Sequence, residues 1–369
     1  MNLTVLQSDL NKALSVASRF ASAKAQLPVL GNILLKAQKN KLTVAATNLE
    51  SSISITIGAQ VAETGEITAP ARIITDIVSH LPKEHIELTL VKEKLSLTTG
   101  NSTSHVSGIS ASDFPEIPNT IGESFLKVPT HELKDAISKV LFATSPDETR
   151  PVLTGLLVII DPSGLTFVAT DGSRLSEKRL SGEFSKTESR FVIPKNAVAE
   201  LVRLLSDESD IDMSFSEKDS QCLFGLTDTV LSSRLIQGEF PNYTKIIPKR
   251  HEIALQTDTE EFKRAIRVAS VFARDSSNVV RLTLLKNSIK VLAQSDKAGE
   301  QISEVDAKVE GNTGKDGITI GFNYKFIEDF LGTVTGESVD MEFTDSDTAG
   351  IFRDPKDIHF LHLIMPVKL

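Results

Sequence analysis

Apolar residues alternate with polar ones in a stretch that recurs along the chain. In residues 164–180 the alternation starts at Leu165, as in a half-buried strand, and breaks at Asp171 and Gly172 before a second strand-like run begins at Arg174. An Asp-Gly pair favours a tight turn, because aspartate bonds the backbone that follows it and glycine accepts a positive φ. The pattern predicts two strands joined by a turn.

The same pattern returns in residues 41–57 and 288–305. The turn positions Asn48, Asp171 and Asp296 lie about a third of the chain apart, which is close to the usual size of one domain. The sequence therefore predicts three copies of one unit. The predicted domains are 1–124, 125–250 and 251–369.

Each third also carries two helical patterns with a single apolar stripe. The first helical pattern of each repeat precedes the predicted hairpin. It follows Ser8–Asp9 in the first repeat, where these residues are an N-cap signal, residues 129–130 in the second and residues 257–258 in the third. The second follows the hairpin and begins near Pro70, Pro194 and Asn323. A helix with one apolar stripe has to pack against a sheet. We therefore predict an α+β fold in which each domain packs two helices on antiparallel sheets.

Charge is unevenly distributed. The formal net charge of −9 argues by itself against nucleic-acid binding. However, the acidic residues gather in strand-rich segments such as 207–219 and 337–347, whereas the first helical segments of the first and third repeats, 9–24 and 258–274, are net basic. If the helices faced one way, one surface would attract phosphates while the protein stayed acidic overall.

The remaining composition indicates an ordered globular protein of the cytoplasm. Hydrophobic residues make up 40% of the chain, and no apolar run approaches the roughly 20 residues of a membrane-spanning helix. The N-terminus lacks a signal-peptide pattern. Cys222 is the single cysteine and lies in an apolar run, so we expect an inert buried thiol.

No pattern of an enzyme, metal or cofactor site is found. The phosphate-loop, dinucleotide, zinc-protease and serine-hydrolase motifs are absent from the sequence. His359 and His362 fall on opposite faces of a strand-like stretch, which disfavours a shared metal. Asp171 fits a turn better than a general base. We expect no catalytic residues, no metal and no cofactor.

Four segments together resemble the bacterial sliding clamps, the beta subunits of DNA polymerase III. They are VATDGSRL at 168–175, GEFPNYTKIIP at 238–248, IGFNYKFIEDFL at 320–331 and IMPVKL at 364–369. The resemblance implies a non-catalytic processivity subunit of the DNA polymerase III holoenzyme in DNA replication. It also implies two three-domain crescents that close head to tail into a homodimeric ring, with helices lining the hole and sheets outside.

The resemblance implies three kinds of partner. Double-stranded DNA is encircled without sequence specificity. Candidate DNA-binding residues, from the resemblance and the basic helix faces, are Lys12, Arg19, Lys24, Arg72, Lys195, Arg264 and Arg267. A second copy of the chain completes the ring through Ser104, Val106, Val271 and Phe272. Ser104 stands where a phenylalanine is expected, so the closing contact is expected to be thinner.

The third kind of partner binds through short peptides. The polymerase catalytic subunit, the clamp-loader delta subunit, and other polymerases and repair or initiation factors are implied to enter a groove between the second and third domains. The implied groove residues are Arg150, Leu153, Thr170, Gly172, Ser173, Arg174, Leu175, Pro241, Lys245, Ile246, Asn323, Phe326, Met365, Pro366, Val367, Lys368 and Leu369.

The groove departs from the family pattern at five of its positions. Ser173 replaces the usual histidine, Lys245 an arginine and Phe326 a tyrosine, while Asp347 and Ala349 replace a hydrophobic residue and a serine. These changes bear on which peptide is preferred. From the sequence alone, Leu153, Leu175 and Val367 fit an ordinary core equally well.

Two other functions stay open on the residues alone. One is an enzyme with a divergent site in a cleft near Asp171, Arg174 and Asp296, which requires titratable groups to cluster there. The other is a β-rich scaffold that binds only proteins and whose helix charges are merely solvated. Composition and repeats without the resemblance favour the scaffold.

Overall fold

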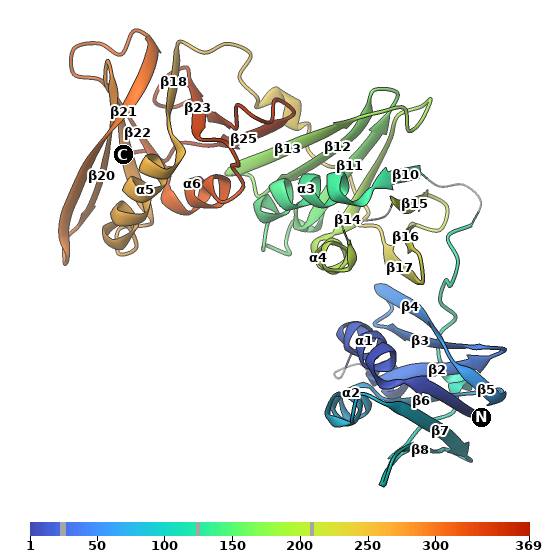
Figure 1. Ribbon diagram of the computed structural model, residues 1–369. Coiled ribbons are helices and arrows are strands. Elements are labelled where there is room, and N and C mark those ends of the chain that lie inside the picture. The colour runs from blue at the N-terminus through green and yellow to red at the C-terminus, as the bar shows by residue number, and fades with distance from the viewer. Residues whose placement is uncertain (23–26, 123–125, 207–209) are drawn as a thin grey trace. The chain divides into compact units, whose positions relative to one another are not determined.

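The computed structural model describes residues 1–22, 27–122, 126–206 and 210–369 (Figure 1). The chain forms two compact units, and each is described here by itself. The first combines Met1–Thr130 with Ser206–Leu235, and the second combines His131–Leu205 with Ile236–Leu369. Lys24, one of the candidate DNA-binding residues, lies outside the described residues.

The first unit contains two antiparallel sheets. The smaller has the strand order β5 (Gln60–Glu63), β1 (Asn2–Leu6), β7 (His85–Val91), β8 (Lys94–Thr99), β9 (Ser102–Ser107). The larger has the order β10 (Leu126–Pro129), β15 (Asp210–Ser216), β16 (Gln221–Leu226), β17 (Thr229–Arg234), β4 (Ser51–Gly58), β3 (Lys41–Thr47), β2 (Asn32–Gln38), β6 (Gly65–Pro70). Helices α1 (Gln7–Ala17) and α2 (Ala71–His80) pack against each other beside these sheets.

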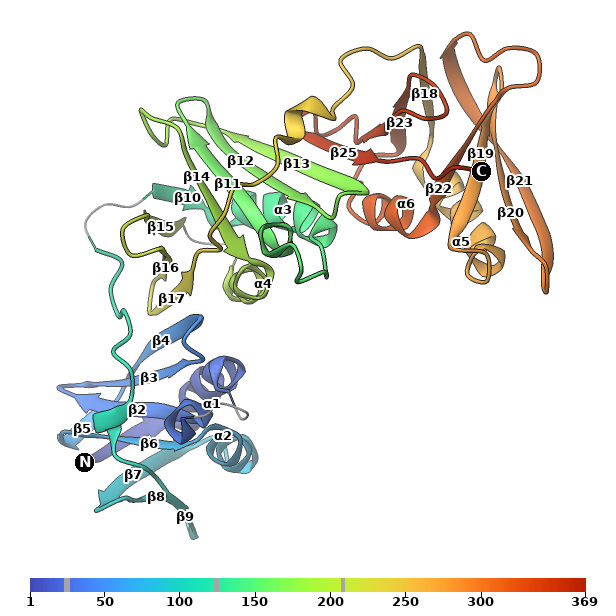
Figure 2. The same ribbon diagram turned by 180° about the vertical axis from the view of Figure 1, so that it is seen from behind.

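The second unit is built on one twelve-stranded sheet. Its order is β14 (Ser189–Pro194), β11 (Gly155–Asp161), β12 (Gly164–Thr170), β13 (Arg174–Ser181), β25 (Phe360–Ile364), β24 (Gly350–Arg353), β23 (Ser338–Phe343), β18 (Ile253–Asp258), β21 (Gly299–Gly311), β20 (Ser288–Ser295), β19 (Val279–Leu284), β22 (Ile318–Asn323). The helices are α3 (Thr130–Val140), α4 (Lys195–Leu204), α5 (Thr259–Ala273) and α6 (Tyr324–Leu331). Figure 2 shows the same elements from behind.

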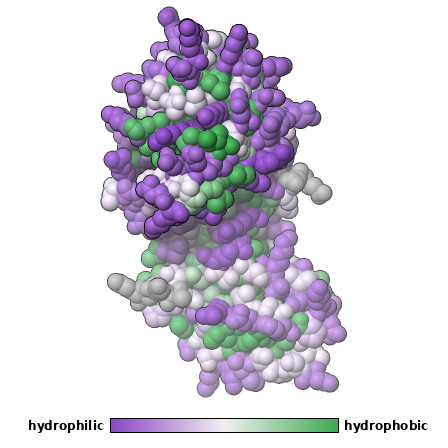
Figure 3. Space-filling view, turned by 90° about the vertical axis from the view of Figure 1, so that its left-hand side faces the viewer, coloured by the Kyte–Doolittle hydropathy of each residue, from purple (hydrophilic) through white to green (hydrophobic). Residues whose placement is uncertain are grey.

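Short 3-10 helices connect several elements. They are η1 (Ser18–Phe20), η2 (Pro28–Gly31), η3 (Ala111–Asp113), η4 (Leu141–Ala143), η5 (Pro151–Thr154) and η6 (Tyr243–Lys245). None of the helices in the described ranges combines the length and the apolarity that a membrane crossing requires. The face shown in Figure 3 is mostly hydrophilic, with small separate hydrophobic patches.

The recurring stretch forms the same strand pair in each repeat, as the alternation indicated. The pairs are β3 with β4, β12 with β13, and β20 with β21. The predicted α+β class with antiparallel sheets and two helices per repeat is confirmed. The two compact units do not follow the repeats, because β15–β17 of the second repeat lie in the first unit. The three-domain division therefore stays a prediction.

One predicted helix start was wrong. Helix α1 begins at Gln7, so Ser8 and Asp9 lie inside its first turn rather than at the cap. Strand β1 leads directly into this helix, and the backbone N–H of Gln7 donates to the carbonyl of Glu84 at 2.9 Å. A carbonyl distant in sequence thus accepts a hydrogen bond from a backbone N–H of the first helical turn, the role that a side-chain cap was expected to fill. In contrast, Asp258 does cap α5 by accepting from the N–H of Glu261 at 2.8 Å.

Strand edges join consecutive repeats. Strand β4 of the first repeat pairs with β17 of the second, and β13 of the second pairs with β25 of the third. In both joints the strand that follows the recurring turn meets a late strand of the next repeat. At the first joint the buried hydroxyls of Ser52 and Ser232 share a hydrogen bond of 2.6 Å.

The cores follow the predicted stripes. On α1, Leu10, Ala13, Leu14 and Ala17 are all buried. The third repeat packs five phenylalanine rings together in its core, with centroids 5.7–6.0 Å apart: Phe322, Phe330, Phe343, Phe352 and Phe360. Cys222 is buried, as expected, and burial raises the pKa of its thiol to about 12.

A buried ion cluster supports the second joint. Asp357 accepts from the ammonium of Lys139 at 2.6 Å and from that of Lys178 at 2.5 and 2.7 Å. Lys139 also contacts Asp135 at 3.1 Å. Burial opposes ionisation of Asp357, but the two lysine hydrogen bonds outweigh it and lower the pKa of this carboxyl. The cluster thus ties α3 and β13 to the segment that precedes β25.

Removing the Asp357 charge should destabilise the second unit. Asp357→Asn leaves two largely buried ammonium groups without their shared carboxylate, which should cost about 2–3 kcal/mol of unfolding free energy. Asp135→Asn is the matched control, because Asp135 is about half exposed and its pair with Lys139 should be worth less than about 0.5 kcal/mol. Urea denaturation at neutral pH measures both variants.

The destabilisation caused by Asp357→Asn should depend on pH. A carboxyl whose folded-state pKa is lowered stabilises the fold above its ordinary pKa, and that stabilisation is lost as the pH falls through the folded-state pKa. The difference between wild type and Asp357→Asn should therefore be constant near neutral pH and shrink in acid, below about pH 4. A difference that grew on acidification would contradict the assignment.

Candidate functional site

The turn after β12 is held in one shape by its own side chains. The hydroxyl of Thr170 donates to the carbonyl of Arg174 at 2.6 Å and accepts from the N–H of Gly172 at 3.1 Å. The carboxylate of Asp171 accepts from the N–H groups of Ser173 and Arg174 at 2.9 and 3.0 Å. Gly172 is exposed at φ +90°, a conformation that favours glycine. The turn is preformed and leaves its tip uncovered.

Arg174 joins this turn to the third repeat. Its guanidinium donates to Asp171 at 3.1 Å and to Asp329 of α6 at 2.5 Å. It also donates to the carbonyl of Phe142 at 2.8 Å and lies over the ring of Phe326, with its central carbon 4.4 Å from the ring centroid. An arginine fork satisfies several acceptors in fixed directions, so the turn and α6 hold a definite spacing.

A neutral histidine lies behind this arginine. His362 is fully buried, stacks on Phe330, and shares a 2.7 Å hydrogen bond between its Nδ1 and the hydroxyl of Ser176. Burial, with a smaller effect of the Arg174 charge, lowers the pKa of His362 to about 3. The ring therefore stays uncharged near neutral pH and adds no repulsion to Arg174.

The C-terminal segment runs from the turn to strand β22 at the edge of the twelve-stranded sheet. The N–H of Met365 donates to the carbonyl of Ser173, and that of Val367 donates to Gly321, both at 2.8 Å. The side chains of Met365 and Val367 are each 38% exposed. Ile246, on the segment after η6, is 45% exposed. These apolar groups are available to a ligand.

Two of the implied groove residues have buried side chains. Leu175 is fully buried, and Leu153 is nearly so. Leu175 packs in one cluster with Tyr243 of η6 and Leu363 of β25. Leu153 and Leu175 are thus core residues in this structure and Val367 lies at the surface, while their implied places in the groove stay predictions.

The other implied groove residues lie around this framework. Arg150 lies beside the turn, with its Nη1 3.8 Å from where a Cβ on Gly172 would be. Asn323 caps α6 by accepting from the N–H of Lys325 at 3.1 Å. Pro241 and Lys245 are exposed on the segment that flanks Tyr243, and Pro366 is half-buried between Met365 and Val367. Lys368 and Leu369 line a pocket on the sheet of β19 and β20 instead of the turn.

Sequence reasoning missed two residues of the framework. Asp329 lies in the quoted segment 320–331, three positions after Phe326, and helical spacing could have placed both beside Arg174. Phe142 contributes a backbone carbonyl and a ring to Arg174, and no sequence signal marks it. The described residues contain no cluster of three or more acidic, histidine or cysteine side chains able to hold a metal.

The candidate DNA-binding residues in the described ranges are all exposed. They are Lys12, Arg19, Arg72, Lys195, Arg264 and Arg267. In the first unit they lie on α1, η1 and α2, and in the second unit on α4 and α5. Arg267 has an acidic neighbour in Glu328, whose pKa is raised by burial against the opposing charges of Arg267 and Arg274.

Comparison with known proteins covers the whole chain. Three family models, for the N-terminal, central and C-terminal domains of the DNA polymerase III beta subunit, match residues 1–118, 127–242 and 244–368. The chain belongs to the DNA polymerase III beta subunit family. The beta sliding clamp of Staphylococcus aureus is 31% identical over 380 aligned positions, with 100% of this chain and 99% of that protein covered.

Solved structures of the family have the same fold. The DNA polymerase sliding clamp of Bacillus subtilis has a TM-score of 0.95 at 27% identity, with 100% of this chain and 99% of that chain covered. The DNA polymerase III beta subunit of Pseudomonas aeruginosa has a TM-score of 0.94 at 26% identity, and both chains are covered fully. The enzyme and protein-only scaffold hypotheses are thereby set aside. The chain is a non-catalytic DNA sliding clamp subunit of replication.

The implied dimer residues differ in exposure. Val271 on α5 is 57% exposed, and Ser104 on β9 is half-buried. Val106 is buried within the first unit, and Phe272 packs partly against the core of the third repeat. Val271 and Ser104 are therefore the members of this set with side chains available to a second copy.

Arg174→Lys should weaken the second unit measurably. A lysine ammonium cannot reach the three acceptors of the fork or stack as a plane on Phe326, so the unfolding free energy should fall by about 1–3 kcal/mol. Arg190→Lys is the control, because Arg190 is more than half exposed and pairs with Glu188, which is also about half exposed, at 2.7 Å. Equal urea midpoints for the two variants would show that Arg174 does not tie the turn to α6.

Proposed function

We propose that two copies of this chain close head to tail into a ring around duplex DNA. We further propose that the groove beside Arg174 captures short peptides of the DNA polymerase III catalytic subunit, the clamp-loader delta subunit, and other polymerases and repair or initiation factors. Membership of the family over the full length carries this proposal. Replication in a bacterium takes place in the cytoplasm, where we place the protein.

The pattern of strand joints supports the ring. Each joint pairs the strand after the recurring turn with a late strand of the next repeat, as β4 does with β17 and β13 with β25. Within the described ranges, residues 299–306 of β21 in the third repeat pair with β20 alone, and β9 in the first repeat pairs with β8 alone. If every repeat formed the same joint, these are the two strands that would still lack a partner. An unpaired strand edge favours the addition of another strand.

Pairing β21 of one copy with β9 of another would repeat the same joint. The contact is heterologous, so it must either close into a ring or continue as a filament. Helices α5 and α2 pack beside these two edges and expose Val271 and Ile73, which is 52% exposed. Burying such aliphatic groups together would stabilise the joint where Ser104 supplies no large side chain.

Exposed cations on the helices suit a DNA-encircling protein. Lysine and arginine contacts to phosphates give weak, salt-sensitive attraction that carries no sequence information. A closed ring needs no stronger contact, since topology keeps it on the duplex. Lys12, Arg19, Arg72, Lys195, Arg264 and Arg267 are our candidates for these contacts.

The groove chemistry suits a short peptide with apolar side chains. Ile246, Met365 and Val367 offer partly exposed apolar surface, while Gly172 leaves room for a close backbone approach. Because Arg174 fixes the spacing of the turn and α6, the peptide would bind to a surface that is already ordered. Ser173, Lys245 and Phe326 are the positions that we expect to tune peptide preference.

Retention on circular DNA tests the proposed function. The protein, assembled by a clamp loader on a nicked circle, should stay bound during gel filtration at high salt and be released when the circle is cut open. Loss from the intact circle at high salt would contradict encirclement, because it would mean ordinary electrostatic binding. Val271→Asp should reduce the retained fraction several-fold by placing a charge in the ring joint. Val91→Asp is the matched control, because Val91 on β7 is also an exposed valine but lies outside the proposed ring joint.

A further inference from the structure

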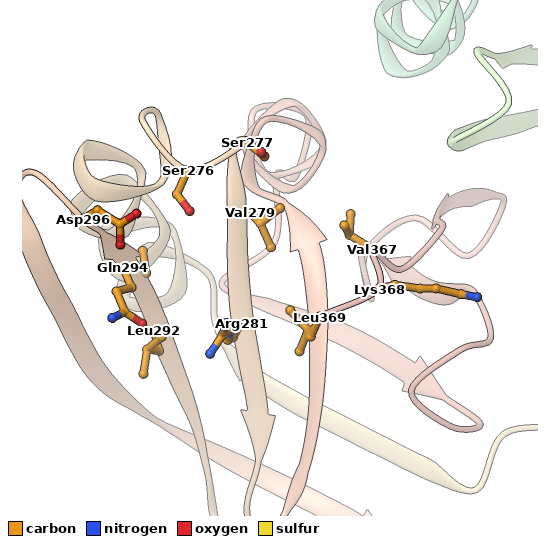
Figure 4. A pocket seen from close by; sticks show the side chains of 11 residues that line it. Ser276, Ser277, Val279, Arg281, Leu292, Gln294, Asp296, Val367, Lys368 and Leu369 are labelled. Atoms are coloured by element: carbon orange, nitrogen blue, oxygen red, sulfur yellow. The ribbon is translucent and has the colours of Figure 1, made fainter.

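A pocket of about 420 Å³ lies over strands β19 and β20 of the third repeat, beyond the groove. Figure 4 shows its lining. Val279 and Arg281 come from β19, Leu292 and Gln294 from β20, and Val367 and Leu369 from the C-terminal segment. Ser276, Ser277 and Asp296 complete its upper end. The implied groove residues include Val367 and Leu369 but none of the pocket residues on β19 and β20.

Arg281 lies at the centre of this pocket. It is paired across the sheet with Leu292 on one side and with Gly321 on the other. Gly321 has no side chain, and Leu369 fills the space, since a Cβ at position 321 would lie 2.6 Å from the Leu369 Cδ2. Arg281 is therefore placed between two leucines, as Figure 4 shows.

The charge of Arg281 is uncompensated in the part of the chain that the structure describes. Among those residues no ion pair joins its guanidinium to a carboxylate oxygen within 4.0 Å, and the guanidinium is part of the pocket lining. Asp296 is at the far end, and Lys368 extends away from it (Figure 4). An exposed guanidinium with an apolar side chain on each side can form an ion pair with a carboxylate while the methylene groups next to that carboxylate pack on the apolar side chains.

The C-terminal segment connects the groove to this pocket. Met365 is hydrogen-bonded to the groove turn at Ser173, and Val367 is hydrogen-bonded to Gly321 beneath the pocket. Leu369, four residues after Met365, lines the pocket itself. A peptide that runs alongside this segment would reach from the groove turn to the pocket in about four extended residues, roughly 13 Å.

We propose that this pocket is an extension of the peptide groove and binds an acidic side chain, Asp or Glu, about four residues outside the part of the peptide that fills the groove. The proposal rests on the proposed peptide-binding function. Arg281 pairs with the carboxylate, Leu292 and Leu369 pack against its methylene groups, and Ser276, Ser277 and Gln294 are available to the adjoining peptide backbone. Arg281 thus selects among partners by the charge of their flanking sequence.

Peptide binding to the full-length protein tests this assignment. The probe is a fluorescein-labelled peptide carrying the clamp-binding segment of the polymerase catalytic subunit. It is compared with versions extended by four residues at either end, each with Glu or Gln at the outermost position. We expect one of the two Glu extensions to lower the Kd about fivefold relative to its Gln counterpart. Arg281→Gln should remove this difference, and Lys286→Gln, at an exposed lysine outside the pocket, should retain it.

A charge exchange separates recognition from structural damage. Arg281→Glu should reverse the preference, so that an extension ending in Lys binds more tightly than one ending in Glu. A Glu extension that gains nothing at either end, or a gain that survives in Arg281→Gln, would overturn the pocket while leaving the groove intact. Failure of the unextended peptide to bind wild-type protein would instead overturn the proposed groove, and this assignment with it.

Discussion

The antiparallel pairing of β13 with β25 is the interaction on which the proposed peptide-binding face depends. It runs from Arg174 opposite Ile364 to Lys178 opposite Phe360, and so makes one sheet out of two repeats. The groove turn is at one end of this ladder, and the Asp357 cluster is at the other. Because sheet hydrogen bonds fix the register, residues nearly 200 positions apart in sequence keep a set spacing.

Two charged assemblies stabilise this joint in different ways. Around Asp357, two largely buried lysines share one carboxylate, so removing that carboxylate takes away the shared partner of two buried positive charges. Around Arg174, the fork orients the turn against α6 and leaves the apolar groups of Met365 and Val367 exposed. The same geometry that holds the repeats together therefore also presents the surface proposed for peptides, and the C-terminal segment continues it toward Arg281.

The sequence predicted the repeated strand pairs and most helices because their apolar periodicity is strong, as on α1 and α5. It could not predict that α1 starts at Gln7, since a carbonyl distant in sequence, that of Glu84, satisfies the helix start. The resemblance indicated Arg174 and Met365, but not Asp329, Phe142 or Arg281. The surroundings of these three residues arise from contacts between repeats and from the pairing of β19 with β20 and β22. The sequence also could not separate buried Leu175 from exposed Val367, because both are apolar residues in strand-like runs.

Hydrogen exchange in the free protein tests most directly whether the binding face is built before any peptide arrives. Amides in residues 170–176 and 360–367 should exchange slowly without a ligand, because the turn and the β13–β25 ladder are already hydrogen-bonded. Adding a groove peptide should then change their protection only slightly. Rapid exchange of both segments in the free protein, with protection gained only on adding the peptide, would contradict a preformed groove.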